Sequence, residues 1–176
     1  MLTKTLSAQQ RAARVRLMVL DVDGVLTDGR LYYGPQGEVM KVFDVRDGHG
    51  IKMLIANGVE VALLSARSSD IVAARARELG ISRLLQGCSD KAGAFATLLG
   101  EAAIASDECG YMGDDLPDLP AMRSAGFAAT VADACEAAKS AAHWITPQPG
   151  GRGAVRALAE FTLRAKGVDI NSMVRG

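Results

Sequence analysis

Residues 15–21 read V-R-L-M-V-L-D, and the chain continues as V-D-G-V-L-T-D-G over residues 22–29. A short, continuous apolar run predicts a buried strand, because a strand covered on both faces has no polar side to alternate. An acid at the end of such a strand is costly unless a metal or a cation compensates its charge. Asp21 and Asp23 are two residues apart, so an extended backbone points both to one side, and Gly24 permits a sharp departure from the strand. This stretch predicts a functional acid pair where a buried strand ends, with a plain capping acid as the alternative.

Strand and helix patterns alternate along the rest of the chain. The sequence predicts a β-hairpin over 31–43 that turns at Gly34-Pro35-Gln36-Gly37. It predicts helices over 47–58, 69–79 and about 90–105, and strands over 59–65, 84–86 and 108–115. After residue 115, a helix, a strand, a helix and a strand follow through 145, and a last helix covers 154–166. The alternation predicts an α/β fold with a Rossmann-like parallel sheet, helices on both faces and a β-hairpin after the first strand. Ligands bind such folds beyond the carboxyl ends of the strands.

The chain has 176 residues, with 20 Lys+Arg against 20 Asp+Glu and a formal net charge of zero. This length predicts one domain over 1–176, with a core over about 15–166 and a flexible tail over 167–176. Nucleic-acid binding requires a basic excess, so no nucleic-acid partner is expected. No window approaches the roughly 18 apolar residues of a membrane span, so no membrane partner is expected either.

The cysteines and the N-terminal residues bear on the cellular compartment. Cys88, Cys109 and Cys135 are odd in number and form no C-x-x-C pair, which argues against a disulfide framework or a cysteine zinc site and favours a reducing compartment. The first residues have no long apolar segment of the kind that a secretory signal needs. We therefore expect a cytoplasmic protein.

A second acidic group lies in Y-M-G-D-D-L-P-D-L-P, residues 111–120, where Asp114, Asp115 and Asp118 crowd together. Repulsion between such neighbours raises their pKa values unless a cation intervenes. Hard oxygen ligands suit Mg²⁺, and no cysteine or histidine grouping favours zinc. His49 and His143 lie far apart and are expected to be polar contacts or core residues.

Two further polar side chains lie between the acidic groups. Ser65 ends the strand predicted over 59–65, and Lys91 opens the helix predicted over about 90–105. A hydroxyl at a strand end and a lysine at a helix start both suit an anionic oxygen. Alone, Ser65 could be a helix cap and Lys91 a solvated surface charge. The order of acid pair, hydroxyl, lysine and acid cluster is the specific signal.

This ordered set resembles the haloacid dehalogenase superfamily of aspartate-nucleophile phosphatases, and within it the family of 3-deoxy-D-manno-octulosonate 8-phosphate phosphatases. The segments that carry the resemblance are D-V-D-G-V-L-T-D-G (21–29), Y-Y-G-P-Q-G-E-V-M-K-V-F (32–43), V-R-D-G-H-G-I (45–51), Q-G-C-S-D-K (86–91), G-D-D-L-P-D-L-P-A-M (113–122) and G-G-R-G-A-V-R (150–156). One departure is Ser65-Ala66-Arg67 where the superfamily often has T-G-R, and serine keeps the hydroxyl.

The resemblance implies a Mg²⁺-dependent phosphatase that hydrolyses the eight-carbon sugar acid phosphate, in lipopolysaccharide precursor synthesis, through an aspartyl-phosphate. It implies these roles: Asp21 as nucleophile, Asp23 as general acid and base, Asp21, Asp114 and the main-chain carbonyl of Asp23 as Mg²⁺ ligands, Asp115 and Asp118 as supports behind the ligands, and Ser65 and Lys91 as partners of the phosphoryl oxygens. A phosphatase for a nine-carbon sialic-type acid phosphate is an alternative within the same chemistry. A non-catalytic regulatory or assembly subunit is a second alternative, against which the complete residue set argues.

The segments between the motifs are too short for the cap domain that many relatives insert, so the resemblance implies a capless member. It further implies a homotetramer whose hairpins pack together and whose neighbouring subunits complete each site. The apolar hairpin residues that suit this packing are Leu31, Tyr32, Tyr33, Val39, Val42 and Phe43, with burial against their own chain as the alternative. The substrate-binding candidates are Thr27, Arg46, Arg67 and Arg152, and each arginine could instead be a surface salt-bridge partner.

Overall fold

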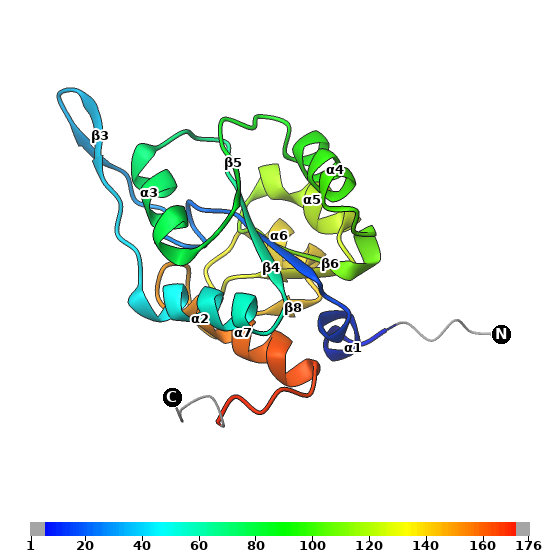
Figure 1. Ribbon diagram of the computed structural model, residues 1–176. Helices are drawn as coiled ribbons and strands as arrows, with labels where there is room; N and C mark the ends of the chain where they lie inside the picture. The colour runs from blue at the N-terminus through cyan, green and yellow to red at the C-terminus, as the bar shows by residue number, and fades with distance from the viewer. Residues whose placement is uncertain (1–5, 172–176) are drawn as a thin grey trace.

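The computed structural model of the chain describes residues 6–171. Its centre is a sheet of six parallel strands in the order β5-β4-β1-β6-β7-β8 (Figure 1). The strands are β1 Leu17–Leu20, β4 Glu60–Leu64, β5 Arg83–Leu85, β6 Cys109–Met112, β7 Phe127–Thr130 and β8 Trp144–Ile145. Leu20 of β1 pairs with Leu63 of β4 and with Met112 of β6, so these three strands end side by side.

Helices cover both faces of the sheet, as the sequence predicts (Figure 1). One face carries α1 Ala8–Ala13, α2 Val45–Ala56, α3 Asp70–Leu79 and α7 Ala154–Ala165, and the other carries α4 Lys91–Ala102, α5 Leu119–Ser124 and α6 Glu136–Ala141. From β1 the chain proceeds to β4 and β5 on one side, and α4 then returns it to β6 on the other side of β1. The strand order therefore reverses at β1, the place where open α/β sheets bind ligands.

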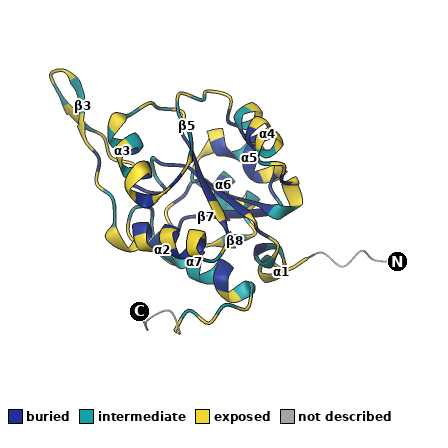
Figure 2. Ribbon diagram, in the orientation of Figure 1, coloured by how far each residue is buried: buried dark blue, intermediate teal, exposed yellow. Residues whose placement is uncertain are grey.

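The central strand is as apolar and as buried as its sequence predicts. All four residues of β1 are fully buried, and β6 and β7 are likewise buried along their whole length (Figure 2). Helices on either side of the sheet begin at acidic caps, because an aspartate oxygen satisfies the unpaired N–H groups of a first turn. Asp44 Oδ1 accepts from the N–H of Arg46 at 2.7 Å before α2, and Asp90 Oδ1 accepts from the N–H of Gly93 at 3.0 Å before α4.

The hairpin after β1 consists of β2 Tyr32–Gly34 and β3 Gly37–Met40, paired antiparallel. It projects away from the body of the molecule (Figure 1), and the side chains of Tyr33 and Val39 are each 61% exposed. Phe43, just beyond the hairpin, packs instead against the core of its own chain. Between β1 and β4 the chain forms only this hairpin and α2, so within residues 6–171 no cap domain covers the site.

Most differences from the sequence expectations lie at element ends. The helix expected as far as residue 105 ends at Ala102, and α1, which begins at a capping box formed by Ser7 and Gln10, was not predicted. Within the expected tail, Val168 and Ile170 pack against the core, whereas 172–176 lie outside the described residues. One domain over the whole chain stays a prediction. No helix within residues 6–171 is long and apolar enough to cross a membrane.

Candidate active site

The carboxyl ends of three neighbouring strands bring the predicted chemistry together. Asp21 follows β1, Ser65 follows β4, and Asp114 follows β6 after one glycine. They line a hollow of about 290 Å³. Its lining includes all seven of the residues expected to act in catalysis, in metal binding or in their support: Asp21, Asp23, Ser65, Lys91, Asp114, Asp115 and Asp118.

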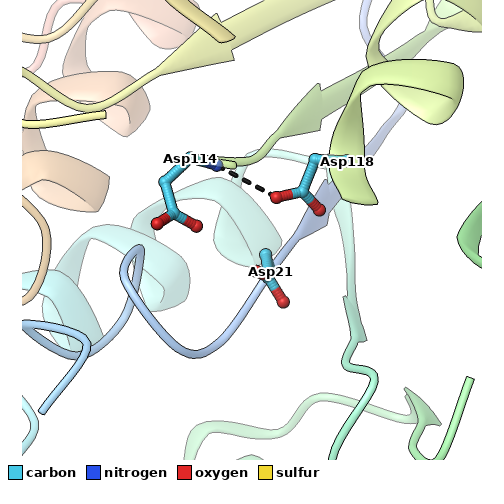
Figure 3. Close-up of side chains that lie close together, drawn as sticks. All are labelled: Asp21, Asp114 and Asp118. Carbon is cyan, nitrogen blue, oxygen red and sulfur yellow. Dashed lines mark hydrogen bonds between the residues drawn. The ribbon is translucent and has the colours of Figure 1, made fainter. Parts of the chain in front are cut away.

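Three of these acids converge on one point. Asp21, Asp114 and Asp118 each offer a carboxylate oxygen, and these oxygens lie within 4.8 Å of one another. Figure 3 shows the three side chains approaching from the ends of β1 and β6 and from the turn before α5. Carboxylate oxygens in this number and spacing are suitable ligands for a hard divalent cation such as Mg²⁺.

Hydrogen bonds distinguish Asp118 from the other two acids. Its Oδ2 accepts from the main-chain N–H groups of Asp114 at 3.1 Å and Asp115 at 3.3 Å. Its Oδ1 accepts from Lys91 Nζ at 2.6 Å and from the Tyr111 hydroxyl at 2.8 Å. Four donors use the accepting capacity of a carboxylate, so Asp21 and Asp114 are the acids better placed to hold a cation.

Lys91 joins two of the acids from the start of α4. Its Nζ lies 3.0 Å from Asp21 Oδ1 and 2.6 Å from Asp118 Oδ1, and its side chain is almost fully buried. Burial alone would lower the pKa of Lys91, but attraction to Asp21 and Asp118 outweighs it and raises that pKa. Lys91 is therefore held as a cation at the centre of the pocket.

The three converging acids outnumber the one lysine beside them, and this affects their pKa values. Burial, followed by repulsion from Asp118, raises the pKa of Asp21 to about 7, although Lys91 opposes the shift. Burial, followed by repulsion from Asp21 and Asp118, raises the pKa of Asp114 to about 7. Raised pKa values of this kind mark carboxylates that lack a compensating cation. Together with the oxygen-only donor set, they show that the pocket fits Mg²⁺.

The loop after β1 approaches this cluster very closely. Gly24 has a φ of +93°, and any side chain at this position would overlap the Asp114 carboxylate. Thr27 is buried, and its Oγ1 accepts from the N–H groups of Gly24 at 3.3 Å and Gly29 at 3.2 Å. These contacts make Thr27 a brace of the loop after β1, and its role in substrate binding stays a prediction.

Ser65 occupies the expected place in the second motif. It is buried at the end of β4, and its Oγ accepts from the N–H of Arg67 at 3.2 Å. Among the described non-glycine residues only Ala103 has a positive φ, so Ala66 adopts ordinary backbone geometry. The alanine that replaces the usual glycine therefore introduces no backbone strain into this loop.

The three candidate arginines separate into two places. Arg67 lines the acidic pocket. Arg46 and Arg152 line a second hollow of about 410 Å³, where Arg46 Nη2 lies 2.7 Å from Asp44 Oδ2 and donates to the Arg152 carbonyl at 3.1 Å. Within one chain, the structure thus brings only Arg67 to the acids.

Sequence reasoning did not identify Lys41 or Tyr111 as site residues. Lys41 lies just beyond β3 and pairs with Asp23 and Glu38, and Tyr111 reaches Asp118 from within β6. A lysine in a β-prone hairpin and a tyrosine in an apolar strand carry no spacing signal. His143 is a polar contact, as expected, with its Nδ1 accepting from the N–H of Ala128 at 2.8 Å.

Comparisons with known proteins agree with this geometry. Residues 70–158 match the model of a family described as haloacid dehalogenase-like hydrolase. The chain is 45% identical over 157 residues to the 3-deoxy-D-manno-octulosonate 8-phosphate phosphatases KdsC of Yersinia pestis and of Escherichia coli K12, with 89% of this chain and 84% of each relative covered.

Solved structures of similar proteins have the same fold. The 3-deoxy-D-manno-octulosonate 8-phosphate phosphatase of Moraxella catarrhalis, in complex with magnesium ion, phosphate ion and KDO, has a TM-score of 0.91 and 40% identity, with 95% of each chain covered. The cobalt-bound phosphatase YrbI of Haemophilus influenzae has a TM-score of 0.87 and 40% identity, covering 89% of this chain and 92% of that one.

Proposed function

This chain belongs to the haloacid dehalogenase-like hydrolases, and on that premise we propose that it is a Mg²⁺-dependent phosphatase of 3-deoxy-D-manno-octulosonate 8-phosphate. The products are the free sugar acid and inorganic phosphate. The similarity to phosphatases of this name, over most of both chains, supports the substrate. No observation favours a nine-carbon acid phosphate or a non-catalytic role.

The observation that carries the proposal is the unequal use of three neighbouring acids. Asp118 is saturated by four donors, whereas Asp21 and Asp114 face the pocket with raised pKa values. Asp21, Asp114 and the main-chain carbonyl of Asp23 would hold Mg²⁺. When bound, this ion neutralises acid charge and draws electron density from the phosphoryl group.

The first half of the reaction uses Asp21 as the nucleophile. An Asp21 carboxylate oxygen attacks phosphorus in line, and the bond to the sugar oxygen breaks as an aspartyl-phosphate forms. Asp23 gives a proton to the departing sugar oxygen. Lys91 and Ser65 bind the phosphoryl oxygens, and the buried Lys91 ammonium stabilises the charge that gathers on them.

The second half returns the enzyme to its starting state. Asp23, now ionised, accepts a proton from a water molecule that attacks the phosphorus of the aspartyl-phosphate. The bond between phosphorus and the Asp21 oxygen breaks, which releases phosphate and restores the carboxylate. Asp23 thereby recovers the proton that it lost in the first half.

The decisive experiment compares substrates and one variant. Phosphate release from the eight-carbon sugar acid phosphate is expected to exceed release from a nine-carbon sialic-type acid phosphate in kcat/KM, and to require Mg²⁺. Asp21→Asn is expected to fold normally without turnover. A preference for the nine-carbon substrate would replace the proposed specificity, and full turnover by pure Asp21→Asn protein would exclude the proposed nucleophile.

The exposed hairpin supports assembly into a homotetramer. The side chains of Tyr33 and Val39 are exposed on an element that extends beyond the body of the chain, and exposed apolar surface grouped in this way marks protein contacts. A second copy of the same hairpin is the proposed occupant, with Arg46 and Arg152 then reaching substrate in a neighbouring subunit. Light scattering is expected to show a tetramer, and a fully active monomer would overturn this part of the proposal.

The proposed setting is the synthesis of lipopolysaccharide precursors in the cytoplasm. Cys88, Cys109 and Cys135 are all unpaired thiols, which is typical of a reducing compartment. Cell fractionation that recovered the protein outside the cytoplasm would contradict this setting.

A further inference from the structure

A buried lysine links the hairpin to the catalytic loop. Lys41 lies just beyond β3, and its side chain is 1% exposed. Its Nζ is paired with Asp23 Oδ1 and lies 2.9 Å from Glu38 Oε1. A buried ammonium is strongly disfavoured unless acids surround it, so the position of Lys41 is tied to both carboxylates.

Arg67 closes the same group of side chains from the β4 side. Its Nη2 lies 2.9 Å from the Tyr33 hydroxyl and 3.5 Å from Glu38 Oε1, and its Nε lies 3.9 Å from Asp23 Oδ2. Lys41 and Arg67 thus contact the Asp23 carboxyl group from two sides, which restricts where it lies.

We propose that Lys41 is the positioning residue for the catalytic carboxyl of Asp23. This inference rests on the proposed function, in which Asp23 delivers the proton to the departing sugar oxygen. Lys41 holds Oδ1 of Asp23 by a direct charge-assisted contact, which leaves Oδ2 as the oxygen available to the reacting group. The contact also makes the placement of Asp23 depend on the hairpin, because Lys41 and Glu38 both belong to that segment.

The need for such a restraint follows from the surroundings of Asp23. Its side chain is 21% exposed, so without Lys41 it has room to rotate toward solvent. A displacement of about 1 Å at a reacting group can cost about 100-fold in rate. In the first half of the reaction, the loss should appear only where the departing oxygen needs a proton, because a sugar alkoxide is a poor leaving group and a nitrophenolate is a good one.

The experiment compares Lys41→Met with the unchanged enzyme on the sugar acid phosphate and on p-nitrophenyl phosphate. The reading is the release of the leaving group in a single turnover, before water attacks the aspartyl-phosphate, because Asp23 acts as the base of that later step with either substrate. The rate of sugar release is expected to fall about 10- to 100-fold, the range of general acid catalysis and its misplacement. The rate of nitrophenolate release by the same variant is expected to stay within about threefold, since its departure needs little proton transfer. KM for the sugar substrate and the Mg²⁺ affinity measured by calorimetry are expected to change little.

Two further variants control the comparison. Lys52→Met removes an exposed lysine of α2 and is expected to leave both activities unchanged. In an Asp23→Asn background, Lys41→Met is expected to cause no further loss, because it acts through Asp23. If Lys41→Met fails to fold, Lys41→Arg serves instead, since it keeps the charge but shifts the donor atoms; it is expected to show the same selective loss.

An equal loss in the single-turnover rates of sugar release and nitrophenolate release would overturn the positioning role, and so would a further loss in the Asp23→Asn background. Full activity of Lys41→Met on the sugar substrate would overturn it as well. Failure of the proposed function has a different signature: Asp23→Asn alone would then turn over the sugar phosphate normally. In that case the acid itself, and not only its positioning residue, would be misassigned.

Discussion

The raised pKa values of Asp21 and Asp114 predict that protons compete with Mg²⁺ for the pocket. Both carboxyl groups have pKa values of about 7 in the protein without a cation, and Mg²⁺ requires the ionised oxygens. Between pH 8 and pH 6, a group of pKa about 7 changes from about one tenth to about nine tenths protonated. If one proton competes with Mg²⁺, the apparent Mg²⁺ affinity is therefore about 10-fold weaker at pH 6 than at pH 8. If two protons compete, it is about 100-fold weaker.

Because the two acids repel each other, their protons belong to the pair, and the observed effect should lie between these limits. Isothermal titration with Mg²⁺ in two buffers of different ionisation enthalpy measures the protons released. We expect about one to two protons for each Mg²⁺ at pH 6, and few at pH 8. The control variant Asp70→Asn changes an acid in the first turn of α3. It should show the same Mg²⁺ affinity and the same proton release as the unchanged protein at each pH. An affinity independent of pH, with no proton release at pH 6, would refute the reasoning.

The same shifts set the sign of the stability change when Mg²⁺ is removed. A carboxyl whose folded pKa lies above its unfolded value stabilises the fold at low pH, and this contribution is lost as the pH rises through the folded pKa. Ionisation of Asp21 alone would lower the free energy of unfolding by about 1 kcal/mol between pH 6 and pH 8. Protein treated with EDTA should therefore melt at a lower temperature at pH 8 than at pH 6, and added Mg²⁺ should raise its Tm more at pH 8. A Tm that rises with pH in EDTA would contradict the shifts.

Three substitutions test other contacts of the site. Asp21→Asn should abolish steady-state phosphate release and leave the circular dichroism spectrum unchanged; retained turnover would disprove nucleophilic attack by this residue. Tyr111→Phe removes one of four donors to Asp118 and should lower the free energy of unfolding in urea by about 1 kcal/mol; no change would show that this hydroxyl contributes nothing. Gly24→Ala would place a methyl group against the Asp114 carboxylate, at a residue with a positive φ. Calorimetry should therefore detect loss of Mg²⁺ binding. An unchanged affinity would show that the loop rearranges to accommodate the methyl group.

Physical reasoning from the sequence could locate the pocket because parallel strands align their carboxyl ends. Asp21, Ser65 and Asp114 each follow an apolar run, and the strand order places those three ends side by side. The helix start at Asp90 was equally predictable, since an aspartate cap places Lys91 in the first turn. Sequence patterns therefore suffice to place residues that follow parallel strands, because the sheet brings the ends of neighbouring strands together.

Contacts that depend on side-chain direction could not be predicted in this way. Lys41 pairs with Asp23, 18 residues before it in the chain, and no periodicity in the sequence encodes that contact. Thr27 lies within the motif but points into its own loop, where it accepts from Gly24 and Gly29. A hydroxyl close to an acid pair in sequence has no preferred partner until the loop is folded.

The acids of the pocket differ in their surroundings because each accepts from a different number of hydrogen-bond donors. Asp115 and Asp118 both follow Asp114 within a short turn, and their spacing alone does not say which of them supports the site. The turn before α5 directs the N–H groups of Asp114 and Asp115 to Asp118, and β6 supplies Tyr111 to the same carboxylate. Asp118 thereby holds Lys91, while it also raises the pKa values of Asp21 and Asp114. A single saturated carboxylate thus keeps the lysine in place and leaves the other two acids in need of a cation.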